Sequence, residues 1–181
     1  MQKEVMLLTG AGQIGMAIAR RMGYGMKIVV GDKRIENAQA VADTMNRAGF
    51  DVLPVEMDLS SRTSILKLID TAQQYGEIAM LVNAAGVSPS QASVETILKV
   101  DLYGTAVLLE EVGKVIRQGG TGVTVSSQSG HRLPALGAET DELLACTPTE
   151  RLLELDVLQP QQIRDTLHAY QLAKRCNVKR V

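Results

Sequence analysis

A tyrosine and a lysine near the end of the chain have a spacing that could support proton transfer. Tyr170 precedes Lys174 by four residues, so both side chains would lie on one face of a helix. An ammonium group beside a phenol favours the phenolate, which would let the tyrosine exchange a proton near neutral pH. The same spacing is common on ordinary helix surfaces, so this interpretation needs support from elsewhere in the sequence.

Three glycines near the start of the chain provide that support. Gly10, Gly12 and Gly15 have the spacing G-x-G-x-x-G, between a predicted strand at 4–9 and a predicted helix at 13–23. This strand-to-helix context is what the dinucleotide-binding fingerprint requires. The first glycine permits a tight turn, the second lets a pyrophosphate approach the backbone, and the third lets helix and strand pack closely.

The residues that would select the cofactor follow from the same motif. The cofactor phosphates should lie at the start of the helix, near the backbone N–H groups of Gln13 and Ile14. Asp32 ends the second predicted strand, where it would accept hydrogen bonds from the ribose of NAD and repel the 2′-phosphate of NADP. Lys33 or Arg34 could bind that phosphate instead, so NAD is the first choice and NADP the second.

The hydrophobic pattern predicts the fold class. The expected strands are mostly continuous apolar runs, which is typical of strands covered on both faces. Their alternation with helical patterns predicts an α/β protein with a doubly wound parallel sheet of Rossmann type, in three layers. We expect a long helix at roughly 91–118 and a last helix from about Pro160. The strands are expected at 4–9, 27–32, 51–57, 78–83 and 121–127.

The segment 130–162 interrupts this alternation. It contains three prolines and six acidic residues, and it should hold two short helices near 139–145 and 149–155. Two interpretations remain open: an insertion that forms a solvated loop, or a lid beside a site at the end of the fifth strand.

Composition excludes several classes of function. The chain has 181 residues, a net charge of −1, no Trp, two Cys and two His. No strong field would attract nucleic acid or an anionic membrane, and no apolar run approaches the ~20 residues of a membrane span. The two cysteines are too far apart for a zinc motif, so we expect no metal site and a cytoplasmic location.

Four further motifs occur in a characteristic order. They are "MDL" at 57–59, "NAAG" at 83–86, "VSS" at 125–127 and the Y-x-x-x-K of 170–174. With the glycine-rich turn, this order resembles the short-chain dehydrogenase/reductase family. The resemblance implies hydride transfer between NAD(P) and a small-molecule secondary alcohol or ketone, by an alcohol dehydrogenase or ketone reductase.

The resemblance also implies roles for individual residues. The catalytic serine maps to Ser127, with Ser126 as the alternative, and the catalytic pair maps to Tyr170 and Lys174. This pair would also contact the cofactor. The other positions expected to line the cofactor are Asp58, Leu59, Asn83, Ala84, Ala85 and Gly86.

The sequence departs from the family pattern at three places. The glycine turn is one residue shorter than the family's commonest form, and Ser127 lies 43 residues before Tyr170 because of the 130–162 segment. Asp101 stands where the family usually has Asn, on the apolar stripe of the long helix. A buried carboxylate is costly without a partner. Asp101 is therefore either a satisfied buried acid or a link in a proton relay that reaches Lys174.

Several expectations concern the whole protein. The resemblance implies a homodimer or homotetramer, and apolar residues beyond the core stripe of the long helix, Leu102, Val107 and Leu109, support this. We expect one nucleotide-binding domain over 1–181 that lacks the family's C-terminal strands and substrate-binding segment. The alternatives to a dehydrogenase are a non-catalytic dinucleotide-binding sensor or regulatory protein, and an NAD-dependent epimerase or dehydratase.

Overall fold

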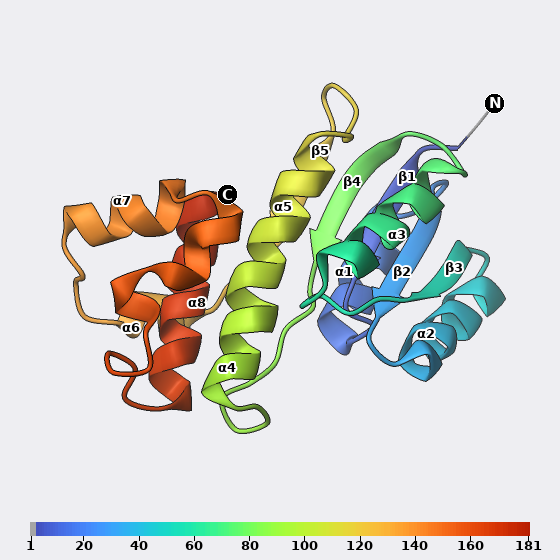
Figure 1. The fold of residues 1–181 in the computed structure, drawn as a ribbon. Helices are drawn as coiled ribbons and strands as arrows, with labels where there is room; N and C mark the ends of the chain where they lie inside the picture. Colours follow the sequence, from blue (N-terminus) through green and yellow to red (C-terminus); the bar gives the residue numbers. More distant parts are fainter. Residues whose placement is uncertain (1–2) are drawn as a thin grey trace. The chain divides into compact units, whose positions relative to one another are not determined.

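The computed structural model describes residues 3–181, in which strands alternate with helices as far as Thr124 and only helical segments follow (Figure 1). The chain divides into two compact units. The first comprises the residues up to Ala85 together with Glu111–Val125, and the second comprises Gly86–Glu110 and Ser126–Val181. Each unit is described by itself below, and the expectation of one nucleotide-binding domain stays a prediction.

The first unit contains a five-stranded parallel sheet with the order β3-β2-β1-β4-β5. The chain moves outward from β1 to β3 and then returns to the other side of β1, so the order reverses between β1 and β4. Ligands of such sheets bind beside the carboxyl ends of the strands at this point. The strands are β1 (Val5–Thr9), β2 (Lys27–Asp32), β3 (Asp51–Glu56), β4 (Ile78–Asn83) and β5 (Thr121–Thr124).

Helices cover both faces of this sheet, which makes the predicted three layers. Helices α1 (Gln13–Met22) and α2 (Ile35–Arg47) share a buried cluster with Val30 of β2. The next residue, Gly31, points to the opposite face, where a Cβ would lie 2.9 Å from the Leu68 side chain of α3 (Arg62–Gln73). The doubly wound parallel sheet expected from the sequence is therefore confirmed.

The long helix after β4 is not uniform. It begins as α4 (Val94–Ile97), widens into a π-helical segment η1 (Leu98–Gly104) and continues as α5 (Thr105–Gly113). Asp101 lies at the centre of η1 and has no exposed surface. Single π turns within α-helices often occur at functional sites, and periodicity alone did not predict this one.

Four short helical segments follow β5 in the sequence, before the last helix. The two helices expected near 139–145 and 149–155 correspond to α7 (Ala138–Cys146) and to the 3₁₀ segment η2 (Thr149–Glu154). The last helix, α8 (Thr166–Arg180), starts six residues later than expected, because the Asp165 side chain caps it by accepting the N–H of His168. The four segments are α6 (Gln128–Arg132), α7 (Ala138–Cys146), η2 (Thr149–Glu154) and η3 (Asp156–Leu158).

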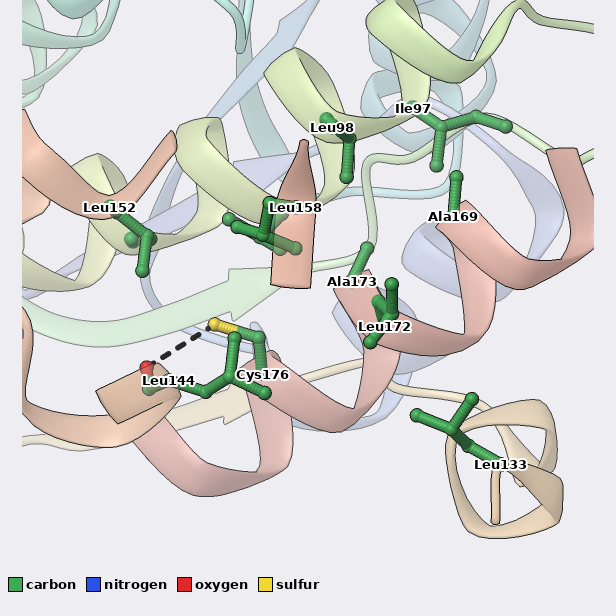
Figure 2. Packing of buried hydrophobic residues seen from close by; sticks show 12 residues of the cluster. Ile97, Leu98, Leu133, Leu144, Leu152, Leu158, Ala169, Leu172, Ala173 and Cys176 are labelled. Atoms are coloured by element: carbon green, nitrogen blue, oxygen red, sulfur yellow. Dashed lines mark hydrogen bonds between the residues drawn. The ribbon is translucent and has the colours of Figure 1, made fainter. Parts of the chain in front are cut away.

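The 130–162 segment supplies much of the core of the second unit. Its residues Leu133, Leu144, Leu152 and Leu158 are buried in one cluster with side chains of α4, η1 and α8 (Figure 2). Figure 2 also shows the thiol of Cys176 directed to the backbone oxygen of Leu144, 3.4 Å away. The solvated-loop interpretation is therefore wrong for these leucines, because the segment contributes buried apolar side chains to the fold.

Charged side chains also hold α7 against α8. Arg175 makes two hydrogen bonds with the carboxylate of Asp141, and Lys179 adds an ion pair at 3.2 Å. The guanidinium of Arg180 donates to the backbone oxygens of Leu144 and Thr147, each at 2.9 Å. These bonds satisfy carbonyl groups that the end of α7 leaves without helical partners.

Two kinds of feature are not found among residues 3–181. No helix there is both long enough and apolar enough to cross a membrane. No group of three or more His, Cys, Asp or Glu side chains in that range is placed to hold a metal ion.

Candidate active site

The glycine turn of the first unit has the geometry that its spacing predicts. Gly10 adopts φ +88°, and a Cβ there would lie 2.6 Å from the backbone nitrogen of Ala85. A Cβ on Gly15 would lie 2.5 Å from the carbonyl oxygen of Gly10. Gly12 differs, because a Cβ at that position would meet no protein atom within 4 Å. The turn therefore needs two glycines for its own packing and leaves open space beside the third.

Helix α1 begins at this open space. Gly12 is its N-cap and provides no side-chain hydrogen bond to the first turn. The first N–H groups of a helix have no intrahelical partner, and the helix dipole places partial positive charge there. Gln13 and Ile14 are exposed at this end. The arrangement fits a pyrophosphate, which would accept hydrogen bonds from these N–H groups.

Asp32 is fixed beside the same turn by three donors. Its carboxylate accepts the N–H of Ala11 at 2.9 Å, the N–H of Arg34 at 3.0 Å and the side-chain amide of Asn37 at 3.3 Å. The acid at the end of β2 is thus held against the glycine turn. Its negative charge occupies the place where the sequence predicted discrimination between NAD and NADP.

The neighbouring Lys33 is paired with another predicted residue. Its ammonium group lies 2.9 Å from the carboxylate of Asp58. Burial opposes the negative charge of Asp58, but hydrogen bonds from Ser60 and Lys33 outweigh it and lower the pKa of this carboxyl group. Leu59 is buried. Lys33 therefore has a partner within the chain that competes with any 2′-phosphate.

Asn83 joins the carboxyl ends of two central strands. Its side-chain oxygen accepts the hydroxyl proton of Thr9 at 2.8 Å, and both side chains are buried. The N–H of Ala84 donates to the carbonyl of Thr9 at 2.9 Å, and Ala85 follows at the close approach to Gly10. This explains why the "NAAG" motif begins with an amide and continues with small residues.

In the second unit, Tyr170 and Lys174 lie on one face of α8. The Lys174 ammonium is 5.4 Å from the centre of the Tyr170 ring, within range of a cation–π interaction. Lys174 has only 5% of its surface exposed, whereas Tyr170 is half-buried. The structure thus confirms that the two side chains come together, and it buries the ammonium rather than leaving it on the surface.

The two serines after β5 have different contacts. The hydroxyl of Ser126 donates to the backbone oxygen of Lys174 at 2.9 Å. The hydroxyl of Ser127 caps α6 and accepts the N–H of Ser129 at 3.1 Å. Accepting this bond leaves the Ser127 proton available for donation, whereas Ser126 already uses its own. The contacts are compatible with the choice of Ser127 over Ser126, which stays a prediction.

Asp101 and Lys174 converge on Gly86. A Cβ on Gly86 would lie 3.0 Å from Oδ1 of Asp101 and 3.4 Å from Nζ of Lys174. The same Oδ1 accepts the N–H of Val87 at 2.8 Å, while Oδ2 is buried without a hydrogen-bond partner among residues 3–181. A larger residue at this position would therefore press against both charged groups.

Burial shifts the pKa values of Asp101 and Lys174 in opposite directions. Burial raises the pKa of Asp101, although the charge of Lys174 and the N–H of Val87 oppose this. Burial lowers the pKa of Lys174, and the charge of Asp101 partly offsets that effect. Strongly shifted titratable groups are frequent at active sites, but also occur in structural ion pairs.

Other reactive residue types show no such arrangement. Burial raises the pKa of the Cys176 thiol to about 12, so it is not an activated nucleophile. His168 accepts the N–H of Arg164 at 3.3 Å beside the α8 cap. Sequence analysis missed Asn177, a buried residue of α8 whose side-chain atoms lack hydrogen bonds among residues 3–181. The sequence could have indicated this residue, because Asn177 is a polar residue on the otherwise apolar, buried stripe of that helix.

A Rossmann-type sheet, a glycine turn at its switch point and a Tyr–Lys pair with a buried ammonium group define a nucleotide-binding protein of the dehydrogenase class. The model of the short chain dehydrogenase family matches residues 4–138. The chain belongs to this family.

Similar proteins and solved structures agree with this assignment. Short-chain dehydrogenase/reductase bsc3 of Alternaria brassicicola is 36% identical over the whole chain, which spans 66% of that protein. Tropinone reductase-like 3 of Erythroxylum coca is 28% identical over 73% of the chain, which spans 55% of that relative. A short-chain dehydrogenase/reductase from Burkholderia phymatum, solved in complex with NAD, matches with a TM-score of 0.65 at 25% identity, covering 74% of this chain and 52% of that structure.

Proposed function

We propose that the chain is an oxidoreductase that interconverts a secondary alcohol and a ketone with NAD as cofactor. The observation that carries this proposal is the Tyr170–Lys174 pair with its buried ammonium group. The family membership and the open glycine turn support it. Because the chain spans less than two thirds of the relatives it matches, the activity of the whole protein is part of the proposal.

The residues divide the chemistry between them. When bound, the cofactor supplies or accepts the hydride. Tyr170 donates a proton to the carbonyl oxygen during reduction and takes it back during oxidation. Ser127 donates a hydrogen bond to the same oxygen and holds it in place. Lys174, whose ammonium group lies beside the ring of Tyr170, would bind the cofactor ribose, and the charge of Asp101 acts on Lys174.

NAD is preferred over NADP because of the charges beside the glycine turn. Asp32 is held there by three donors, and Lys33 is paired with Asp58. The 2′-phosphate of NADP would be repelled by the carboxylate of Asp32 and would have to compete with Asp58 for an ion pair with Lys33. Titration of the chain with both cofactors should give the tighter binding for NAD. Tighter binding of NADP would contradict this role of Asp32 and indicate that Lys33 or Arg34 binds the phosphate.

The Tyr170→Phe variant tests the catalytic assignment. The substitution removes the hydroxyl and keeps the ring, so NAD should still bind while turnover of a panel of ketones falls by at least about 10²-fold. Tyr24→Phe is the matched control, because Tyr24 is 86% exposed and should retain full activity. Near-normal turnover by Tyr170→Phe would contradict the proposal. NAD binding by the wild type without turnover of any substrate would favour a sensor or regulatory role.

A further inference from the structure

Asn37 contacts the acid that ends β2. It is the third residue of α2, and its side-chain amide donates a hydrogen bond to Oδ1 of Asp32 at 3.3 Å. Both residues are half-buried. Asparagine has a lower helix propensity than alanine, leucine or glutamate, so the helix itself gives no reason for an amide here. The hydrogen bond to Asp32 gives one.

The donors to Asp32 are divided unequally between its two oxygens. Oδ1 accepts the N–H of Arg34 at 3.0 Å as well as the amide of Asn37. Among residues 3–181, Oδ2 accepts only the N–H of Ala11, at 2.9 Å. Each carboxylate oxygen has about two lone-pair sites. The start of α2 therefore uses both sites of Oδ1, whereas Oδ2, beside the glycine turn, keeps one site for a ligand.

The bond from Asn37 also fixes the direction of the carboxylate. Donors on both oxygens oppose rotation of the group, and they leave Oδ2 as the atom that can accept a ribose hydroxyl. The N–H groups of Ala11 and Arg34 belong to the backbone. Asn37 is therefore the donor that a side-chain substitution can remove.

The guanidinium of Arg34 makes the direction of this carboxylate important. Lys33 is paired with Asp58 at 2.9 Å. The exposed Arg34 side chain forms no hydrogen bond or ion pair within the part of the chain that the structure describes. A carboxylate released by Asn37 could pair with this cation, and it would then repel a 2′-phosphate less strongly.

We propose that Asn37 is a positioning residue for cofactor selection, which directs Oδ2 of Asp32 to a hydroxyl of the adenosine ribose and keeps the carboxylate where it repels a 2′-phosphate. The inference rests on the proposed use of NAD. It adds that the preference for NAD depends on the amide of Asn37 as well as on the charge of Asp32.

Calorimetric titration with NAD, NADP and the 2′-deoxyadenosine analogue of NAD tests this proposal without turnover. Asn37→Ala removes the donor and favours the helix, so the fold should be retained. The ratio of the NADP to the NAD dissociation constant should fall about threefold or more, as expected for the loss of one hydrogen bond. Removing the 2′-hydroxyl of NAD should cost less affinity in this variant than in the wild type.

Gln39→Ala is the matched control. Gln39 lies on the same helix, and its side-chain amide donates to the carboxylate of Asp43 at 2.8 Å in an exposed position. Its removal should leave both cofactor affinities unchanged. In an Asp32→Ala background, Asn37→Ala should change the affinity ratio no further, because the amide acts through the carboxylate.

The outcomes separate this proposal from the proposed function. A wild type that binds neither dinucleotide, or binds NADP more tightly, contradicts the proposed cofactor and this role of Asn37 with it. If the wild type prefers NAD and Asn37→Ala keeps the same ratio, the cofactor stands and the role of Asn37 is overturned. An equal effect of Asn37→Ala in the Asp32→Ala background overturns it as well. If the alanine variant does not fold, Asn37→Leu, which keeps the size of the side chain, decides by the same ratio.

Discussion

At the scale of single residues, the second unit places a carboxylate and an ammonium where water barely reaches. Asp101 has no exposed surface and Lys174 has 5% of its surface exposed. Both side chains lie close to Gly86, where a Cβ would be in contact with them. Removing one partner of a buried pair usually destabilises a protein, whereas a well-packed apolar replacement of both is often tolerated. The charges therefore suggest a role in the site rather than a gain in stability.

The buried carboxyl group predicts an unusual pH dependence. Because burial raises the pKa of Asp101, the folded chain binds this proton more tightly than the unfolded chain does. Its contribution to stability is full below the ordinary carboxyl pKa of about 4 and is lost as the pH rises through the raised value. The unfolding free energy of the wild type should therefore fall relative to Asp101→Asn from about pH 4 upward, as measured by urea unfolding.

Asp141 provides a control with the opposite sign. The hydrogen bond from Arg175 lowers its pKa, so its contribution is present above the ordinary pKa and is lost as the pH falls. The wild type should gain stability relative to Asp141→Asn as the pH rises. Parallel pH profiles for the two variants would contradict the electrostatic description of Asp101.

At the scale of elements, two glycines of the same turn have different roles: Gly15 is needed for packing, and Gly12 is expected to leave space for the cofactor. Gly15→Ala places a Cβ 2.5 Å from the Gly10 carbonyl oxygen and should destabilise the fold by about 1–3 kcal/mol. Gly12→Ala meets no protein atom within 4 Å, so its stability should stay within about 1 kcal/mol of the wild type. The added methyl group occupies the expected pyrophosphate position, and NAD affinity should fall at least about tenfold.

Thermal unfolding and calorimetric NAD titration measure these two effects. Unchanged NAD affinity in Gly12→Ala would show that the phosphates do not bind at this turn. Equal destabilisation by both substitutions would contradict the close approach of Gly15 to Gly10.

The 130–162 segment is tested by two adjacent leucines of α7. Leu144 is fully buried in the cluster of the second unit, whereas Leu143 is 45% exposed. Leu144→Ala should cost about 2–5 kcal/mol of unfolding free energy, and Leu143→Ala should stay within about 0.5 kcal/mol. Denaturant unfolding measures both. Similar small effects would indicate that the segment acts as a loosely packed lid, the interpretation that the sequence left open.

At the scale of the whole molecule, the sequence predicted the elements with strong periodic signals. Continuous apolar runs placed the five strands, and the turn signals placed the glycine loop and Asp32 correctly. The predicted start of the last helix at about Pro160 was wrong. The cap at Asp165 is a local hydrogen bond that hydrophobic periodicity does not report. The π turn around Asp101 and the buried amide of Asn177 depend on tertiary packing, so no local pattern predicted them.

The packing of the long helix also bears on which residues could form an oligomer interface. The resemblance implied an oligomer built through the long helix, supported by Leu102, Val107 and Leu109. Leu102 lies in the chain's own buried cluster and Val107 has no exposed surface, which leaves only Leu109 half-buried. A stable interface of standard size buries about 800 Å² per partner around an apolar core. Leu102, Val107 and Leu109 by themselves do not expose enough apolar surface for such a core.

The homodimer or homotetramer that the resemblance implies therefore stays a prediction, and sedimentation velocity at micromolar concentration is the measurement. A monomer would contradict it, and if an oligomer forms, Leu109→Glu tests whether the half-buried Leu109 lies in its interface. A charge buried in an interface without a partner is strongly unfavourable, so dissociation of the Leu109→Glu variant would restore the long helix as the interface. A dimer that persists in this variant must form through a different surface of the chain.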